Sequence, residues 1–197
     1  MALVKHGITK DTPSNVLLGA GTWFKGLKFE TGTGWTGTVL GATSGGSSIK
    51  ITPEVKDIEI DGALVLAKGL AVMQGGTGEA EVNFAEINAD ILKMTTLGEV
   101  LGSESEGYVD GFDCVQTKNA ITEGDYVENL GFVGYTADGS KQVIVILENA
   151  LCKSGFQIDP KNKENSVVKA TFTAYGGIDT DLDRVPIKIY YPKAATV

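Results

Sequence analysis

The chain has 197 residues, with 25 acidic and 17 basic side chains and a formal net charge of −8 at pH 7. This length suffices to bury roughly 70% of the unfolded surface, and we expect one domain. The 26 glycines and only 5 prolines indicate many turns in an ordered fold, whereas the acidic balance argues against a surface that neutralises nucleic-acid phosphates.

The N-terminal segment, about residues 1–14, contains no apolar run of signal-peptide length. No later segment reaches the roughly 18 apolar residues that a membrane-spanning helix needs. We therefore expect synthesis and folding in a cytoplasm, with residues 1–14 as a flexible arm.

Residues 31–48 are rich in Gly, Thr and Ser, and are too long for an ordinary hairpin connection. Loops of this length are usually functional or disordered. Because Trp35, Val39 and Leu40 are apolar residues within it, we expect a long functional loop.

Alternation of apolar and polar residues with a period of two predicts half-buried antiparallel strands in residues 51–61, 79–84, 168–174 and 185–189. Residues 143–147 are apolar at every position, which predicts a central strand covered on both faces. The side chains expected to face the core are Ile58, Ile60, Ala80, Val82, Phe84, Val168, Ala170, Phe172, Ala174, Val185, Ile187 and Ile189.

One helix is predicted at about residues 88–97. Asn88 is a favoured N-cap, Asp90 lies in the first turn, and Gly98 stands at the position of a C-cap glycine. A staple between Ile87 and Leu92 is expected at its start. The apolar stripe formed by Ile87, Ile91, Leu92 and Thr95 should cover the second face of the strand at residues 143–147.

Both cysteines, Cys114 and Cys152, lie in apolar, strand-like segments. Thiols stay reduced in a cytoplasm, and cysteine packs as a small hydrophobe. We expect two buried free thiols, with a disulfide as the alternative.

Four patterns that resemble chemical sites lack the context that each chemistry needs. Residues 32–37 match G-x-G-x-x-G, but no helix can begin after them. Residues 179–183 resemble the start of a calcium loop, yet its sixth position is Arg184. His6 is the single histidine, and acidic pairs such as Asp110 and Asp113 are common in an acidic chain. We predict no enzyme activity and no catalytic, cofactor-binding or metal-binding residues.

Several segments carry a resemblance to a known family. They are Asn15–Gly21, Thr38–Gly46, Ile51–Gly62, Lys68–Val72 with the helix after it, and the tail Val185–Tyr191. In these segments the chain resembles the major tail protein, or tail tube subunit, of long-tailed, siphovirus-like bacteriophages. The likeness covers about the first half well, and the second half mainly in strand order.

The resemblance implies a mainly β fold, an antiparallel two-sheet sandwich or barrel flanked by one short helix. It also implies a non-enzymatic virion protein, assembled in the bacterial cytoplasm, whose hexameric rings stack into a tube around a channel for the genome. The implied partners are other copies of the chain, tail proteins at the tube ends and the tape measure protein in the lumen. DNA would pass without specific binding, and no cofactor is expected.

Two sets of residues are assigned hypothetical roles in such a tube. Trp35, Val39 and Leu40 are expected to contact a neighbouring ring, because apolar anchors dominate interface energies. An acidic strand face is expected to line the channel and to let a polyanion slide. Its members are Asp57, Glu59, Asp61, Glu79 and Glu81.

Two alternatives remain open at this stage. One is the tube protein of a contractile tail or a related injection apparatus, which shares the fold. The other is a carbohydrate-binding β-sandwich in which aromatic side chains form a sugar-stacking platform. Its members would be Trp23, Trp35, Tyr126 and Tyr135.

Overall fold

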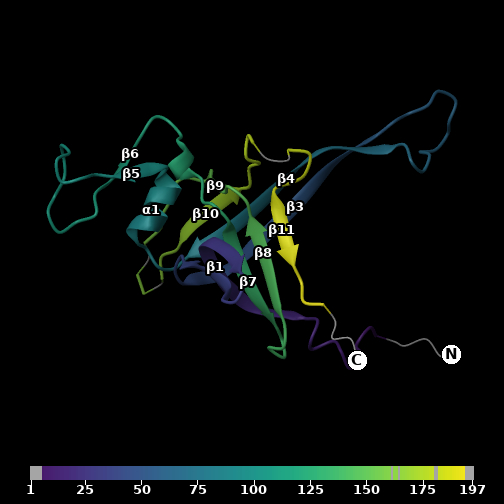
Figure 1. Cartoon of the computed structure of the whole chain (residues 1–197), viewed down its shortest axis with the longest axis horizontal. Coiled ribbons are helices and arrows are strands. Elements are labelled where there is room, and N and C mark those ends of the chain that lie inside the picture. Colours follow the sequence, from purple (N-terminus) through teal and green to yellow (C-terminus); the bar gives the residue numbers. More distant parts are fainter. Residues whose placement is uncertain (1–5, 161, 164, 180–181, 194–197) are drawn as a thin grey trace.

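A computed structural model of the chain describes residues 6–160, 162–163, 165–179 and 182–193. Figure 1 shows a β-rich body from which one long hairpin projects on one side, with a small two-stranded lobe and a helix at the opposite side. The elements that build the body belong to two antiparallel sheets.

The larger sheet has five strands in the order β11-β8-β7-β1-β2, and every neighbouring pair is antiparallel. Its interior strand β8 is buried over most of its length, as the apolar run at residues 143–147 predicts. The strands are β1 (Leu17–Glu30), β2 (Gly34–Val39), β7 (Leu130–Thr136), β8 (Gln142–Leu147) and β11 (Ile187–Tyr190).

The second sheet has four strands in the order β3-β4-β10-β9. They are β3 (Thr43–Asp57), β4 (Ala71–Phe84), β10 (Val168–Thr173) and β9 (Leu151–Cys152). A separate two-stranded sheet joins β5 (Gly98–Val100) to β6 (Val115–Thr117), and a 3-10 turn, η1, spans Glu123–Asp125.

The main core lies between the five-stranded and the four-stranded sheets. Trp23, Phe132 and Leu147 enter it from the first sheet, and Phe84 and Phe172 enter it from the second. The Trp23 Nε1 group also donates a hydrogen bond across this interface to the Ser47 hydroxyl, at 3.0 Å. The mainly β, antiparallel sandwich with a short helix is therefore confirmed.

The helix α1 runs from Ala89 to Thr96, close to its predicted range. The Asn88 side chain caps its start by accepting a hydrogen bond from the Ile91 backbone N–H at 2.9 Å. The predicted C-cap glycine is wrong, because Leu97 takes the left-handed conformation with a φ of 51°. Gly98 instead begins β5, where an added Cβ would lie 2.6 Å from the Gln116 carbonyl oxygen.

The buried face of α1 differs from the predicted stripe. Ile91, Met94 and Thr95 are buried, whereas Leu92 is half-buried and Ile87 is exposed. Ile91 and Met94 join the main core, so α1 does not cover the second face of β8. That face is covered by a cluster within its own sheet, which contains Leu27, Val133, Ile144 and Ile146 with Phe24 and Trp35 packed against it.

This burial pattern makes a prediction about two neighbouring helix residues. Ile91→Ala should lower the free energy of unfolding by about 2–5 kcal/mol, because it leaves a cavity in the core. Leu92→Ala, at a half-buried position, should cost about 1 kcal/mol. Urea unfolding of both variants followed by circular dichroism compares them directly. Equal losses would contradict the assignment of Ile91 to the core.

The segment predicted as one long loop, residues 31–48, is mostly strand. It contains the β1–β2 turn, all of β2 and the start of β3. Its glycines suit close packing as well as turns: a Cβ on Gly37 would lie 3.2 Å from the Leu27 Cα. Of the predicted N-terminal arm, residues 1–5 lie outside the described residues, and residues 6–14 form mostly exposed turns.

Candidate functional site

A long hairpin formed by β3 and β4 leaves the body of the protein. The two strands pair through twelve residue pairs, from Thr43–Phe84 to Asp57–Ala71. Residues 53–75, here called the arm, are exposed at every position except the half-buried Leu70. Residues 58–70 connect the strands and form the arm tip (Figure 1).

The arm tip is folded by two glycine turns. The Ala63 backbone N–H donates to the Ile60 carbonyl at 3.1 Å, and the Leu70 N–H donates to the Ala67 carbonyl at 3.2 Å. Gly62 and Gly69, at the third position of these turns, have φ angles of 86° and 95°. Such positive angles suit a type II turn with glycine at that position.

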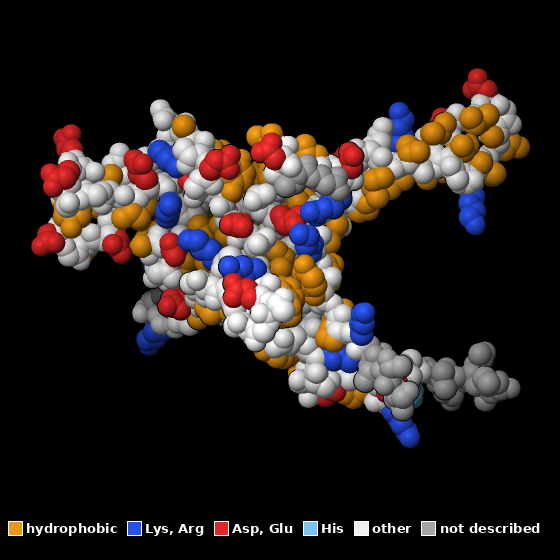
Figure 2. Space-filling view, viewed as in Figure 1, with side chains coloured by type: hydrophobic (Ala, Val, Ile, Leu, Met, Phe, Trp, Pro, Cys, Tyr) orange, Lys and Arg blue, Asp and Glu red, His pale blue; other side chains and the backbone are white. Residues whose placement is uncertain are grey.

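The arm carries a concentration of exposed apolar side chains. Leu64 is 100% exposed and Val65 is 80% exposed. Figure 2 shows hydrophobic side chains, in orange, covering much of the end of the arm. The exposed set is Val55, Ile58, Ile60, Leu64, Val65, Leu66, Val72 and Met73. Contiguous apolar surface of this kind marks an interaction site in a soluble protein.

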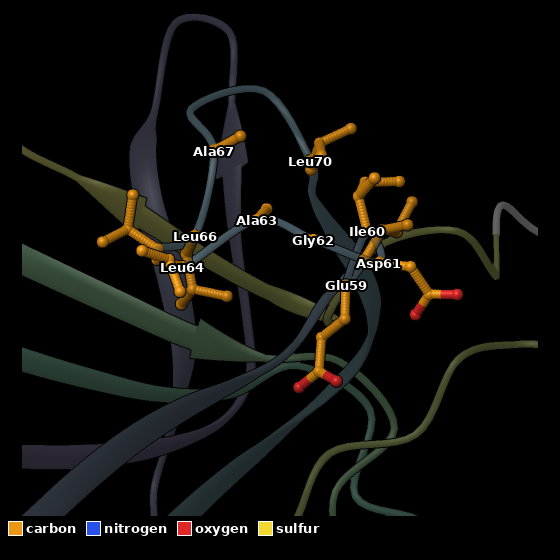
Figure 3. A pocket seen from close by; sticks show the side chains of 11 residues that line it. Glu59, Ile60, Asp61, Gly62, Ala63, Leu64, Leu66, Ala67 and Leu70 are labelled. Atoms are coloured by element: carbon orange, nitrogen blue, oxygen red, sulfur yellow. The ribbon is translucent and has the colours of Figure 1, made fainter.

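The arm tip encloses an open hollow of about 610 Å³ that its own residues line. In Figure 3, Leu64 and Leu66 lie together at one side of the tip, whereas the carboxylates of Glu59 and Asp61 lie at the other side, beside Ile60. The tip therefore presents an apolar side and an acidic side.

The base of the arm is fixed to the body through glycines of β4. An added Cβ on Gly76 would lie 2.6 Å from the Val185 Cγ2, and one on Gly78 would lie 2.3 Å from the Ile187 Cδ1. Val185 and Ile187 thus occupy the space that side chains at Gly76 and Gly78 would need. This contact ties the start of β11 to the hairpin where it leaves the body.

The outer face of the five-stranded sheet carries the second apolar surface. Trp35 contacts Phe29 at a ring-centroid distance of 5.5 Å and Tyr190 at 4.8 Å, both edge to face. Phe29 is 62% exposed, and Tyr190 and Tyr191 are also exposed. We call these four residues the aromatic face. They line a hollow of about 550 Å³ together with Gln142, Ile144 and Pro192.

Polar and ionic contacts hold the edge of the aromatic face. The Tyr191 hydroxyl donates to the Asn15 Oδ1 at 2.8 Å, and the Lys141 Nζ donates to the same oxygen at 2.9 Å. On β11, Lys188 pairs with Glu148, which also accepts from Arg184 at 2.7 Å. Burial alone would raise the pKa of Glu148, but these two cations hold it below its ordinary value.

The outer face of the four-stranded sheet is polar. The register places Glu79 opposite Lys50 and Glu81 opposite Ser48 on β3, and the same carboxylates face Thr173 and Thr171 on β10. Lys169 follows on this face, because it lies two residues before Thr171. The two sheets therefore present opposite characters to the outside.

The three residues predicted to contact a neighbouring ring do not form one surface. Leu40 is 3% exposed in the main core, where its carbonyl accepts a hydrogen bond from the Asn88 side chain. Trp35 belongs to the aromatic face, and Val39 is exposed at the end of β2. The prediction is wrong for Leu40, because Trp23 and α1 pack around the chain where β2 ends.

The five carboxylates predicted to share one face are also separated. Glu79 and Glu81 lie on the polar face of the four-stranded sheet, whereas Asp57, Glu59 and Asp61 belong to the arm. Ile58 and Ile60, expected in the core, are exposed on the arm tip. Ile189 is exposed too, because β11 is an edge strand of its sheet.

The structure argues against a shared aromatic sugar platform. Trp23 is fully buried, and Tyr126 packs edge to face on Tyr175, with ring centroids 5.6 Å apart. Tyr135 lies on β7, where its hydroxyl accepts a hydrogen bond from Gln142. Residues 32–37 form the β1–β2 turn and the start of β2, and the next element is the strand β3 rather than a helix.

The remaining candidate groups are dispersed. Both cysteines are free thiols, but only Cys152 is buried, and Cys114 is half-buried in the loop before β6. His6 is exposed, and residues 180–181 of the calcium-like segment lie outside the described residues. Within the described ranges, no group of three His, Cys, Asp or Glu side chains could hold a metal ion.

Comparisons with known proteins give no family for this chain. No protein-family model matches it, and no curated protein matches its sequence. Among the residues that the structure describes, no helix has the length and the apolar character of a membrane span.

Proposed function

We propose that the protein is a structural, self-assembling subunit of a phage tail tube, in which hexameric rings stack around a channel for the genome. The observation that carries this proposal is the arm, whose tip exposes Leu64, Val65 and Leu66 to solvent. Such a surface is a liability in a monomer and an interface in an assembly. The resemblance of the sequence to tail tube subunits supplies the kind of assembly.

The contrast between the two outer sheet faces supports an orientation for the subunit. A wall of the channel should be polar, and the four-stranded sheet presents Glu79, Glu81, Lys50 and threonines on its outer face. The aromatic face is the less suitable lining, because an exposed apolar surface of this kind marks an interaction site. In this proposal the four-stranded sheet faces the channel.

In this orientation only two of the five carboxylates predicted to line the channel, Glu79 and Glu81, would face it. Lys50 stands directly opposite Glu79, so the face is polar and close to neutral. A lining without a strong positive field still lets DNA pass, because few phosphates would be neutralised. Asp57, Glu59 and Asp61 lie on the arm and would not line the channel.

The edges of the four-stranded sheet supply a means of ring closure. In the part of the chain that the structure describes, β3 and β9 are its outermost strands. Pairing of β3 in one copy with the β9 side of the next would be a heterologous contact, which gives a ring where the rotation closes.

The proposed location is the virion, with other tail proteins at the tube ends and the tape measure protein in the lumen.

Electron microscopy of the purified chain and of an arm variant tests the proposal. In the variant, residues 59–69 are replaced by Asn-Gly, a two-residue hairpin turn, because the Ile58 N–H already bonds to the Leu70 carbonyl at 2.9 Å. Concentrated wild-type protein should form tubes of uniform width. The variant should keep its β-sheet circular dichroism spectrum and remain monomeric.

Two results would overturn the proposal. A wild-type protein that stays monomeric at every concentration, with no tubes or rings, would exclude a tube subunit that assembles on its own. A folded variant that still forms tubes would remove the arm tip from assembly. A glycan array on the same preparations tests the binding-module alternative, which expects a monomer with a sugar ligand.

A further inference from the structure

The chain carries two exposed apolar surfaces, of which one projects and the other is hollowed. The arm tip is a projecting loop with Leu64, Val65 and Leu66 exposed. The aromatic face is hollowed, with a volume of about 550 Å³ between Phe29, Trp35 and Tyr190. This volume lies within the roughly 300–1,000 Å³ of pockets that hold a drug-sized ligand, so there is room for apolar side chains of a loop.

The charges around the two surfaces are also complementary. The acidic side of the tip holds Glu59 and Asp61, with Lys68 as the single basic residue of residues 58–70. Beside the aromatic face stands Lys141, whose Nζ lies 5.5 Å from the Tyr191 ring centre. The charge of Lys188 on β11 is already balanced by Glu148. Lys193 follows Pro192, a residue that lines the hollow. Such an arrangement favours and orients association.

The geometry of the hairpin favours contact with a different copy of the chain. The arm is fixed at its base, where Val185 and Ile187 pack over Gly76 and Gly78. From there the paired strands carry the tip away from the body, as Figure 1 shows. A tip held at this distance leaves the aromatic face of its own chain uncovered.

We propose that the arm tip of one copy seats its leucines and valine in the hollow of the aromatic face of a second copy. This inference deepens the proposed function by naming the surface that receives the arm. Because tip and hollow are different surfaces, the contact is heterologous and can repeat from copy to copy. With the four-stranded sheet toward the channel, the aromatic face points outward, and the arm lies on the outer wall of its neighbour.

Cysteine cross-linking between two variants tests this contact. One variant carries Leu64→Cys and the other Phe29→Cys, both with Cys114→Ser, while the buried Cys152 remains. Mixed under oxidation, the two should give at least about tenfold more disulfide-linked dimer than either variant alone. The control mixture pairs Leu64→Cys with Glu81→Cys on the polar face and should stay at the background level. Mass spectrometry of the linked peptides identifies the pair.

Charge substitutions give a second, independent measurement. Leu64→Asp and Phe29→Asp should each raise the concentration needed for assembly by about 30-fold, the equivalent of a hot-spot loss of about 2 kcal/mol. The double variant should be little worse than either single one, because both changes remove the same contact. Ile178→Asp and Phe112→Asp, at exposed apolar positions elsewhere, should change it less than about twofold.

The outcomes separate this inference from the proposed function. Wild-type tubes without cross-linking above the control, and with additive effects of Leu64→Asp and Phe29→Asp, would overturn the arm contact and leave the tube subunit standing. Cross-linking between Leu64→Cys and Phe29→Cys without wild-type tubes or rings would support the contact and reject the tube. Circular dichroism of each variant verifies that these exposed positions leave the fold intact.

Discussion

Trp23→Ala is expected to lower the free energy of unfolding by about 3–5 kcal/mol, the range for a fully buried tryptophan. The indole packs on Phe132 at a ring-centroid distance of 5.3 Å. Its Nε1 donates a hydrogen bond to the Ser47 hydroxyl at 3.0 Å and so links the two sheets. Loss of the side chain opens a cavity between the sheets and removes this link.

Trp23→Phe is the matched control, because it keeps an aromatic ring in the core and removes the donor. It should cost less than Trp23→Ala, about 1–3 kcal/mol, for the lost volume and the unpaired Ser47 hydroxyl. Urea unfolding at neutral pH gives both values. A loss below about 0.5 kcal/mol for Trp23→Ala would show that the sheets do not meet at this residue.

The sequence predicts the parts of the fold whose local pattern and final environment agree. Val168, Ala170 and Phe172 alternate with polar residues and are buried in β10, as expected. Asn88 caps α1 because its side chain can accept an N–H of the first turn in any context. In both cases the tertiary environment agrees with the local signal.

The arm shows where the same signal is insufficient. Ile58 and Ile60 alternate with acidic residues just as core strands do, yet both are exposed. A period of two shows only that one face is apolar, and it does not show which surface will cover that face. The signal of an exposed apolar surface was the run Leu64-Val65-Leu66 between Gly62 and Gly69. Three consecutive apolar residues in a turn region fit neither a half-buried strand nor a solvated loop.

The glycine content of residues 31–48 gave the wrong prediction of a long loop for a related reason. Glycine is typical of loops, but in a sheet it also marks close approach of a neighbouring group. Gly37 lies in β2 against Leu27, and Leu27 also fills the space that a side chain on Gly131 would need. Only the tertiary structure distinguishes these roles. The aromatic face could not be derived for the same reason, since Phe29, Trp35 and Tyr190 come from three strands.

The free energy of unfolding should fall in acid, because two carboxylates join segments of the chain through ion pairs and hydrogen bonds. The Asp125 carboxylate, nearly inaccessible, accepts from the Thr122 backbone N–H at 2.6 Å and lies 2.7 Å from the Lys118 Nζ. Glu148 joins the end of β8 to Lys188 on β11 and to Arg184. The contacts of Asp125 anchor the chain after β6, and those of Glu148 anchor the edge strand β11.

The direction of the pH effect follows from the pKa of each group. Burial by itself would raise the pKa of Asp125, but the hydrogen bonds from Lys118 and Thr122 together hold it below its ordinary value of 3.8. The pKa of Glu148 is likewise below its ordinary value of 4.5. The unfolded chain therefore takes up these protons at a higher pH than the folded chain does.

At pH 7 both carboxylates are expected to contribute their full stabilisation to the free energy of unfolding. The contribution should decline as the pH falls through the ordinary values and on through the lower pKa values of the folded protein. Asp125→Asn should cost about 1–3 kcal/mol at pH 7, because it weakens a buried charged contact, and the difference from wild type should shrink as the pH is lowered. Glu148→Gln should behave alike with a smaller loss, because its partners are partly exposed.

Urea unfolding at a series of pH values from 7 downward measures both variants beside the wild type. Glu104→Gln is the control, because Glu104 is an exposed residue of the loop between β5 and β6. Curves for Asp125→Asn and wild type that stay parallel down to acid pH would show that the loss does not arise from ionisation. Because the ion pair of Lys118 and Asp125 joins the chain just after β6 to η1, hydrogen exchange in Asp125→Asn should be accelerated first around these elements, before the main core opens.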